Sequence, residues 1–280
     1  MNDGEDNSVA DETTVTVGTS VGGIILVDTI WNTENSPYII TSNIQSAYAI
    51  TLQVDSGVRI IGNDMDIEVF GSLDINGSED KKVVLENVHI VPGSGPIDDW
   101  FDINIEHVIA DGGSIYAPSP GAIYGSLSLS NSILLNLDYM YIWYPAEDTR
   151  IEKNIFINSG GISTGHREDI KVYIRNNVFY QSTGDIGSVY AVRNWATYGT
   201  SETIVEFNTF LSVDRVAVEV TIDGSMMAKN NYWNTLDTVI IESMINDVND
   251  DLSLPGEISY DLFLTEPHVD TPDPTSYLPQ

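Results

Sequence analysis

The sequence predicts an all-β chain wound as a solenoid of short strands. One phrase occurs four times between residues 151 and 233: an apolar residue three positions before an Asn, and an aromatic residue two positions after it. The four Asn are 23, 31 and 23 residues apart; an interval of 23 residues is the length of one solenoid turn, and the middle interval is longer. Each unit holds runs of Ile, Val, Phe and Tyr bounded by Gly, Asn, Ser and Thr, as strands do.

Equivalent positions of successive turns stack at the strand spacing of about 4.8 Å, so the repeat predicts three files of side chains. An aromatic file faces inward: Phe156, Phe179, Phe210 and Trp233. An Asn ladder lies where the backbone bends and where Asn tolerates a left-handed φ: Asn154, Asn177, Asn208 and Asn231. A file of alternating charge faces solvent, two positions before each Asn: Glu152, Arg175, Glu206 and Lys229.

Further short motifs accompany the repeat: N-S-G-G at 158–161, Q-S-T-G at 181–184, S-P-Y-I-I-T at 36–41, L-Q-V-D-S-G-V-R-I at 52–60, G-S-L-D-I-N-G at 71–77 and N-N-Y-W-N-T at 230–235. With these motifs the chain resembles the right-handed parallel β-helix repeat family, the fold that pectate-lyase-like proteins share. The resemblance covers residues 28–265 and implies an exported bacterial protein, located outside the cell or on its surface. It does not specify an activity, because lyases, hydrolases, epimerases, adhesins and ice-binding proteins share the fold.

One domain with caps at both ends is predicted over residues 22–265, since no linker interrupts the strand rhythm. The run G-G-I-I-L-V-D at 22–28 is expected to cap the first coil, with Trp31 as part of that cap. A short helix is expected at 237–245, with Asp237 as its N-cap, sealing the other end.

The two terminal segments differ from the domain in composition. Residues 1–21 are polar and acidic, which predicts a disordered tail. Residues 266–280 contain four prolines and read as an extended tail or linker.

The charge balance limits the partners of this chain. Lys and Arg number 11 against 42 Asp and Glu, a net charge of −31, which argues against nucleic acid and anionic membrane surfaces. No cysteine is present, so the core and not disulfides must stabilise the fold. The composition suits a salty or calcium-containing medium, and we expect a monomer with no transmembrane segment.

The interval between Asn177 and Asn208 is about eight residues longer than one turn, which places an extra loop near residues 185–200. Loops beside a rigid scaffold often carry function. Arg193 lies in this stretch with three aromatic residues, a combination that would bind an acidic sugar: Tyr190, Trp195 and Tyr198. A packed loop with one surface arginine is the alternative.

Two further stretches are aromatic. Trp100 lies among Asp98, Asp99 and Asp102, a combination able to stack on a sugar ring and to ligate a hard cation. In the run 137–145, one alternating set must face outward, and an outward aromatic set would grip polysaccharide. The two sets are Tyr139, Tyr141 and Trp143, and Met140, Ile142 and Tyr144.

A partial calcium motif follows the predicted C-terminal helix. Asp247, Asn249 and Asp251 have the one-three-five spacing of a calcium loop. Leu252 and Ile258 stand where an EF-hand has Gly and Glu, so a plain capped turn is the alternative.

These observations favour an extracellular or cell-surface module that binds carbohydrate. One alternative is a polysaccharide lyase, in which Arg193 or Lys171 is the base and Ca²⁺ neutralises the uronate of an acidic glycan. A glycoside hydrolase needs two carboxylates at a defined separation, and any pairing among 42 acidic residues is arbitrary. A structural spacer or adhesin is the third possibility.

Overall fold

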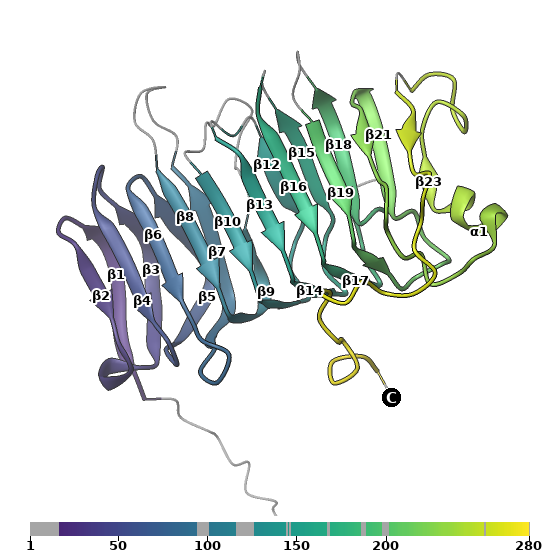
Figure 1. The fold of residues 1–280 in the computed structure, drawn as a ribbon. Coiled ribbons are helices and arrows are strands. Elements are labelled where there is room, and N and C mark those ends of the chain that lie inside the picture. Colours follow the sequence, from purple (N-terminus) through teal and green to yellow (C-terminus); the bar gives the residue numbers. More distant parts are fainter. Residues whose placement is uncertain are drawn as a thin grey trace, which may run out of the picture.

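A computed structural model of the chain shows an all-β solenoid of parallel strands, as the repeat predicted (Figure 1). Three parallel sheets, here named A, B and C, form its walls. The structure describes residues 17–93, 101–115, 126–143, 145, 147–166, 169–185, 189–197, 202–254 and 256–279.

The strands of each sheet follow one another in chain order. Sheet A contains β1 (Thr19–Ile25), β3 (Tyr38–Ser46), β5 (Arg59–Val69), β7 (Val83–Pro92), β9 (Val108–Ile115), β11 (Ile133–Leu135), β14 (Ile155–Ile157), β17 (Val178–Tyr180) and β20 (Thr209–Phe210). Sheet B contains β2 (Thr29–Trp31), β4 (Thr51–Asp55), β6 (Ser72–Asn76), β8 (Asp102–Glu106), β10 (Ser126–Ser130), β13 (Thr149–Glu152), β16 (Lys171–Arg175), β19 (Glu202–Glu206), β22 (Met226–Met227) and β24 (Ile258–Ser259). Sheet C contains β12 (Met140–Trp143), β15 (Ile162–His166), β18 (Val192–Thr197), β21 (Val218–Asp223) and β23 (Ile245–Asn246).

The predicted aromatic file is confirmed. Phe156, Phe179, Phe210 and Trp233 are buried, and successive ring centroids lie 5.0, 5.3 and 5.0 Å apart. These distances match the strand spacing, because the rings stack one turn above another. The charge file is confirmed where its members pair in register: Glu152 lies opposite Arg175, and Arg175 opposite Glu206 at 2.6 Å.

The Asn ladder is also present, with one difference from the sequence prediction. The Oδ1 atom of Asn177 accepts hydrogen bonds from both the backbone N–H and the side-chain amide of Asn154, each at 3.0 Å. Asn208 and Asn231 repeat this contact one turn further on. The left-handed φ falls on the residue before each Asn and not on the ladder Asn itself: Lys153, Asn176, Phe207 and Asn230. The side-chain amides of the ladder Asn therefore do not form the bend themselves, and they hydrogen-bond from one turn to the next.

The two ends of the solenoid differ. At the N-terminal end, β1 begins at Thr19, inside the segment predicted as a tail, and Trp31 stacks on Tyr38 within the first coil at 4.6 Å. At the C-terminal end lies the predicted helix, α1 (Thr238–Ser243), and the Asp237 side chain accepts a hydrogen bond from the backbone N–H of Val239. Among the described residues, one further helical turn is η1 (Thr33–Asn35).

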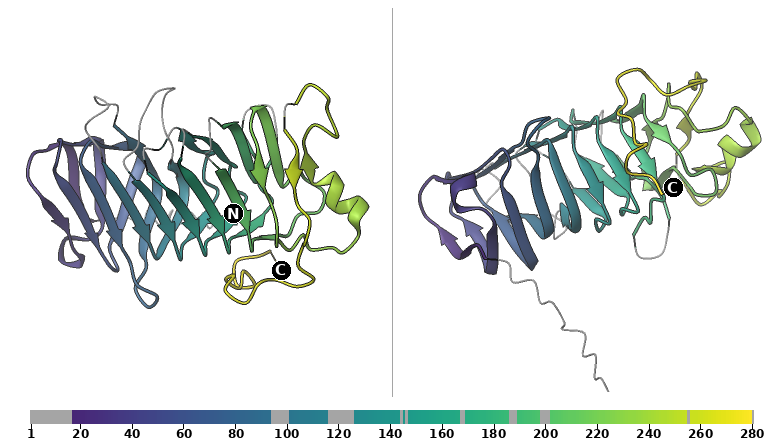
Figure 2. Two further views of the ribbon diagram at one scale, coloured as in Figure 1. Left: turned by 45° about the horizontal axis from the view of Figure 1, so that its top comes forward. Right: turned by 90° about the horizontal axis from the view of Figure 1, so that it is seen from below.

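The C-terminal segment turns back along the solenoid toward β14 and β17 (Figures 1 and 2). The Thr271 hydroxyl donates to the carbonyl oxygen of Phe207 at 2.9 Å, and the His268 ring lies 4.6 Å from the Phe207 ring. Leu278 packs against a cluster of apolar residues on the outer face of sheet A: Ile133, Ile155, Ile157 and Val178. Within the described residues, no helix is both long enough and apolar enough to cross a bilayer.

Candidate functional site

One file of side chains on the outer face of sheet C brings together polar groups from five turns. The strand register stacks Tyr141, Ser163, Arg193, Glu219 and Asn246 in succession. Their neighbours along each strand, such as Met140 and Val192, belong to the core. Because side chains alternate along a strand, the five members of this file point away from the core.

Arg193 is the centre of this file. Its Nε atom lies 2.5 Å from Oε1 of Glu219, and its Nη1 atom lies 2.7 Å from Oδ2 of Asp185. The other carboxylate oxygen of Glu219 accepts a hydrogen bond from the Asn246 amide at 2.8 Å. The Arg193 side chain is only 12% exposed and that of Glu219 only 5%. Charge-assisted bonds with so little water around them hold these side chains in one geometry.

Tyr190 attaches the loop before β18 to this face. Its ring lies 3.9 Å from the guanidinium carbon of Arg193, and its hydroxyl donates to Asp185 at 3.0 Å. Gly161 leaves room for the Tyr190 ring in this position, because a Cβ at residue 161 would lie 2.3 Å from that ring. Burial raises the pKa of Tyr190 well above its usual range, so the phenol stays protonated.

Aromatic side chains border the polar file. Tyr139 and Tyr141 are half-buried and meet edge to face, with ring centroids 5.8 Å apart. Met140 and Ile142 are buried, so Tyr139 and Tyr141 face outward, while Tyr144 lies outside the described residues. Trp195 is half-buried and passes close to Gly165, where a Cβ would lie 3.4 Å from the indole. The outer face of sheet C therefore combines flat apolar surfaces with fixed polar groups.

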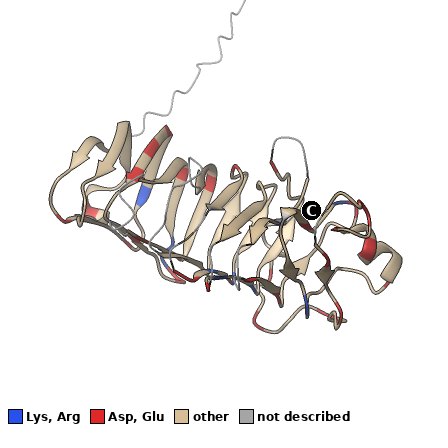
Figure 3. Ribbon diagram, turned by 90° about the horizontal axis from the view of Figure 1, so that it is seen from above, with Lys and Arg blue, Asp and Glu red and all other residues tan. Residues whose placement is uncertain are grey.

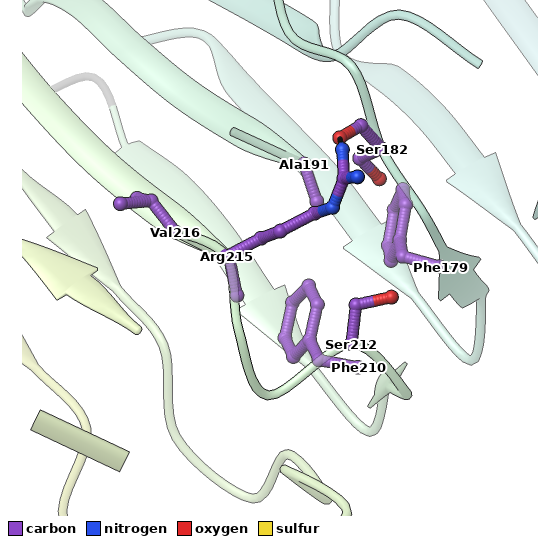
Figure 4. A pocket seen from close by; sticks show the side chains of 8 residues that line it. Phe179, Ser182, Ala191, Phe210, Ser212, Arg215 and Val216 are labelled. Atoms are coloured by element: carbon purple, nitrogen blue, oxygen red, sulfur yellow. Dashed lines mark hydrogen bonds between the residues drawn. The ribbon is translucent and has the colours of Figure 1, made fainter. Parts of the chain in front are cut away.

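An open hollow adjoins the polar file. It is lined by Val189, Asp214, Arg215, Val216, Glu219 and Asn246. The side chain of Arg215 reaches across a neighbouring small pocket beside Phe179 and Phe210, and its Nη1 atom donates to the carbonyl oxygen of Ser182 at 3.0 Å (Figure 4). Arg215 therefore ties two loops together at the edge of the hollow, and a ligand in the hollow would reach Glu219 and Asn246.

The two basic residues considered as catalytic bases do not share one site. Lys171 lies on sheet B, with its Nζ atom 2.9 Å from Glu202, whereas Arg193 lies on sheet C. The hydrogen bond that the Lys171 ammonium donates to the Glu202 carboxylate raises the pKa of Lys171. Each residue is held by a carboxylate, and the assignment of either as a base stays a prediction.

The structure describes only some of the aromatic residues that were predicted to bind sugar. Tyr190 and Trp195 lie beside Arg193, as the sequence suggested. Tyr190 is fully buried and packs against the Arg193 guanidinium group. Trp143 is on β12, but its side chain is not among those described. Trp100 and Tyr198 lie outside the described residues.

The carboxylate of Asp247 is bonded to the backbone of its own loop. Its Oδ1 accepts from the N–H of Asn249 and its Oδ2 from the N–H of Ile258, both at 2.8 Å. Asp251 likewise accepts from the N–H of Ser253 at 2.8 Å. Across the described ranges, no group of three or more His, Cys, Asp or Glu is arranged to hold a metal ion. Calcium binding by this loop stays a prediction.

Sequence reasoning missed Ser163, Glu219 and Asn246. A signal for the first two was present, because the strand centres I-S-T at 162–164, V-R-N at 192–194 and V-E-V at 218–220 align when each middle residue is placed on the outer face. Unequal loops between these strands hid the alignment, since the separations are 30 and 26 residues (193 − 163 and 219 − 193).

A scan against protein-family models finds no match to this chain, and searches of curated proteins and of solved structures find none either.

Proposed function

We propose that this chain is an extracellular or cell-surface module that binds carbohydrate through the outer face of sheet C. The observation that carries the proposal is the common face of Tyr141, Arg193, Trp195 and Glu219. Sugars present flat C–H surfaces that stack on aromatic rings and hydroxyls that need oriented hydrogen-bonding partners. Both kinds of partner are present here, and the polar ones are fixed before a ligand arrives.

The charge of the site favours a neutral glycan. Arg193 is bonded to two carboxylates, Asp185 and Glu219, so the three groups together carry one negative charge. Glu219 is almost buried, where a second anion nearby would be repelled with little screening by water. A uronate would meet this repulsion and a neutral sugar would not.

The resemblance to pectate-lyase-like proteins and the export of the chain are parts of the same proposal. The net charge of −31 suits a protein that stays soluble in a salty medium. A lyase reading has less support than binding, because Arg193 and Lys171 lie on different sheets and each forms an ion pair.

Removing the outward aromatics tests the proposal. Trp195→Ala and Tyr141→Ala should each weaken glycan binding by about five- to tenfold, because each removes one ring on which a sugar stacks. Binding is measured on an array that holds both neutral and uronate-containing glycans. The matched control is Tyr173→Ala, since Tyr173 lies on the outer face of sheet B between the guanidinium groups of Arg150 and Arg175.

The control should bind as the unmodified chain does, and circular dichroism should show every variant folded. Two results would count against the proposal: equal losses in Tyr173→Ala and Trp195→Ala, or no binding to any neutral glycan. Calcium-dependent release of unsaturated uronate products would instead favour the lyase alternative.

A further inference from the structure

The N-terminal end of the solenoid is apolar and almost without charge. Between residues 17 and 31 the only charged residue is Asp28, in a chain whose net charge is −31. Elsewhere the acidic residues are distributed along the solenoid (Figure 3). Four large apolar side chains at this end are each more than half exposed: Ile24, Leu26, Val27 and Ile30. Apolar groups clustered on a soluble surface commonly mark a site of association.

The backbone at this end also offers unused hydrogen-bonding groups. Strand β1 is the terminal strand of sheet A and β2 that of sheet B, and in the described part of the chain neither pairs on its outer side. Proteins usually protect such edges with charged residues or proline, but β1 reads T-S-V-G-G-I-I and holds neither. A Cβ at Gly23 would meet nothing within 4 Å, so a second backbone has room to approach.

The core itself is accessible between these two strands. A hollow at the end of the solenoid is lined by Ser20, Val21, Gly22, Ile25, Thr29, Trp31 and Ile44. Val21 and Ile25 pack against the main core and are only partly buried. A surface laid across this end would therefore bury apolar core and satisfy strand edges at the same time.

We propose that this end binds a second copy of the chain, N-terminal end to N-terminal end, in place of the monomer expected from the sequence. A two-fold axis would set β1 antiparallel to β1 of the second copy, so the same unpaired groups face each other in matching register. Two chains of charge −31 repel strongly, and the nearly uncharged end is where they can approach most closely. Among the described residues sheet C begins at β12, far from this end, so its outer face stays open in such a dimer.

The oligomeric state of the full chain tests this proposal. Sedimentation equilibrium should give twice the chain mass of 30.8 kDa, with association that strengthens as salt screens the net charge. Leu26→Glu and Ile30→Glu each place two like charges across the axis and should raise the dissociation constant by about tenfold or more. The matched control is Leu252→Glu, which adds the same charge at an exposed apolar residue between β23 and β24, the last strands at the opposite end.

A mass of one chain at every concentration would overturn the proposal, and so would equal dissociation in the Glu variants and in Leu252→Glu. A variant that lacks residues 1–16 tests whether the chain's own N-terminal segment, and not a second copy, covers this end. If it associates while the full chain does not, the chain's own N-terminal segment covers this end and the proposal is wrong. Leu26 lies between β1 and β2 and not within a strand, so Leu26→Glu decides the matter should Ile30→Glu fail to fold.

Discussion

His166 is a titratable side chain held inside the solenoid. It is fully buried at the end of β15, and its Nε2 atom lies 2.5 Å from the Thr203 hydroxyl oxygen. The same hydroxyl lies 3.1 Å from that of Thr164, which is also buried. Burial lowers the pKa of His166 to about 4, because the interior disfavours the imidazolium. The native state therefore holds this histidine neutral.

The buried imidazole makes the stability of the chain depend on pH. The pKa of His166 is about 4 when folded and 6.5 when unfolded, so between these values the unfolded chain binds the extra proton. The contribution of His166 is thus fully present above pH 6.5 and is lost as the pH falls toward 4. At about 1.4 kcal/mol for each pKa unit, the loss is about 3 kcal/mol.

Urea unfolding of the unmodified chain and of His166→Gln at several pH values measures this effect. The free energy of unfolding should fall more steeply with acid in the unmodified chain, because only that chain has the buried imidazole. Both proteins share the same carboxylates, so the carboxylates contribute equally to the two slopes. Parallel pH profiles would show that His166 does not control the acid sensitivity.

Residues that repeat from turn to turn were predictable, and single residues were not. The Phe file and the Asn ladder each occupy the same place in four turns, so the period alone placed their side chains. His166 has no such counterpart, since its register partner on β18 is Thr197. Nothing in the local sequence G-H-R-E-D distinguishes an inward histidine from one in a surface turn.

At the level of whole elements, the Asn ladder links successive turns at a corner of the solenoid. Asn177 accepts two hydrogen bonds from Asn154, and its amide donates to the Ile151 carbonyl oxygen at 2.8 Å and to Asn208 at 3.0 Å. All of these groups are buried. A side chain that bonds both the turn before and the turn after it cannot be removed without leaving polar atoms unpaired on each side.

Asn177→Ala should therefore lower the free energy of unfolding by roughly 3 kcal/mol or more, since each buried polar group left unpaired costs about 1–3 kcal/mol. Asn104→Ala is the matched control, because Asn104 lies on the outer face of sheet B and bonds Asp74 in an exposed pair. That variant should stay within about 0.5 kcal/mol of the parent. Thermal or urea unfolding of both variants gives the comparison. Equal costs would mean that the ladder adds nothing beyond surface hydrogen bonds.

The sequence predicted an extra loop near residues 185–200, but Val192–Thr197 form β18 of sheet C, and Arg193 and Trp195 lie on that strand. Nothing in the sequence indicated that Tyr190, just before β18, packs onto the sheet. Tyr190 lies against Gly161, 29 residues earlier in the chain, and no repeat relates these two positions. The extra length near residues 185–200 predicted additional residues beside the strands but not the surface against which they pack. The polar file of sheet C therefore had to be read from the register of the strands.

On the scale of the whole molecule, the C-terminal segment covers part of the outside of the solenoid. Composition favoured an extended tail because of its four prolines. Evidence that the segment covers the solenoid lies in distant strands, in the runs I-F-I at 155–157 and V-F-Y at 178–180. These runs lack the alternation of polar and apolar residues that is typical of a strand with one solvent-exposed face. Such runs indicate strands buried on both sides. Leu278 is part of the cover, and the Asn176 amide lies 2.9 Å from Nδ1 of His268.

Replacing Leu278 tests whether this cover stabilises the chain. Leu278→Asp places a charge against the apolar cluster of Ile133, Ile155, Ile157 and Val178, so the segment should detach and expose that cluster. We expect a loss of about 1–3 kcal/mol in the free energy of unfolding, together with new binding of a hydrophobic dye. Val269→Asp is the matched control, since Val269 belongs to the same segment but is exposed.

The control adds the same charge to the same segment and should change neither the unfolding temperature nor the dye signal. The distinction matters because a solenoid is stabilised mainly by contacts between neighbouring turns. The C-terminal segment breaks that pattern, because Leu278 packs against residues that lie 100 to 145 positions earlier in the chain (278 − 178 and 278 − 133). If Leu278→Asp unfolds at the same temperature as Val269→Asp, these distant contacts are incidental, and the turns alone determine how the molecule unfolds.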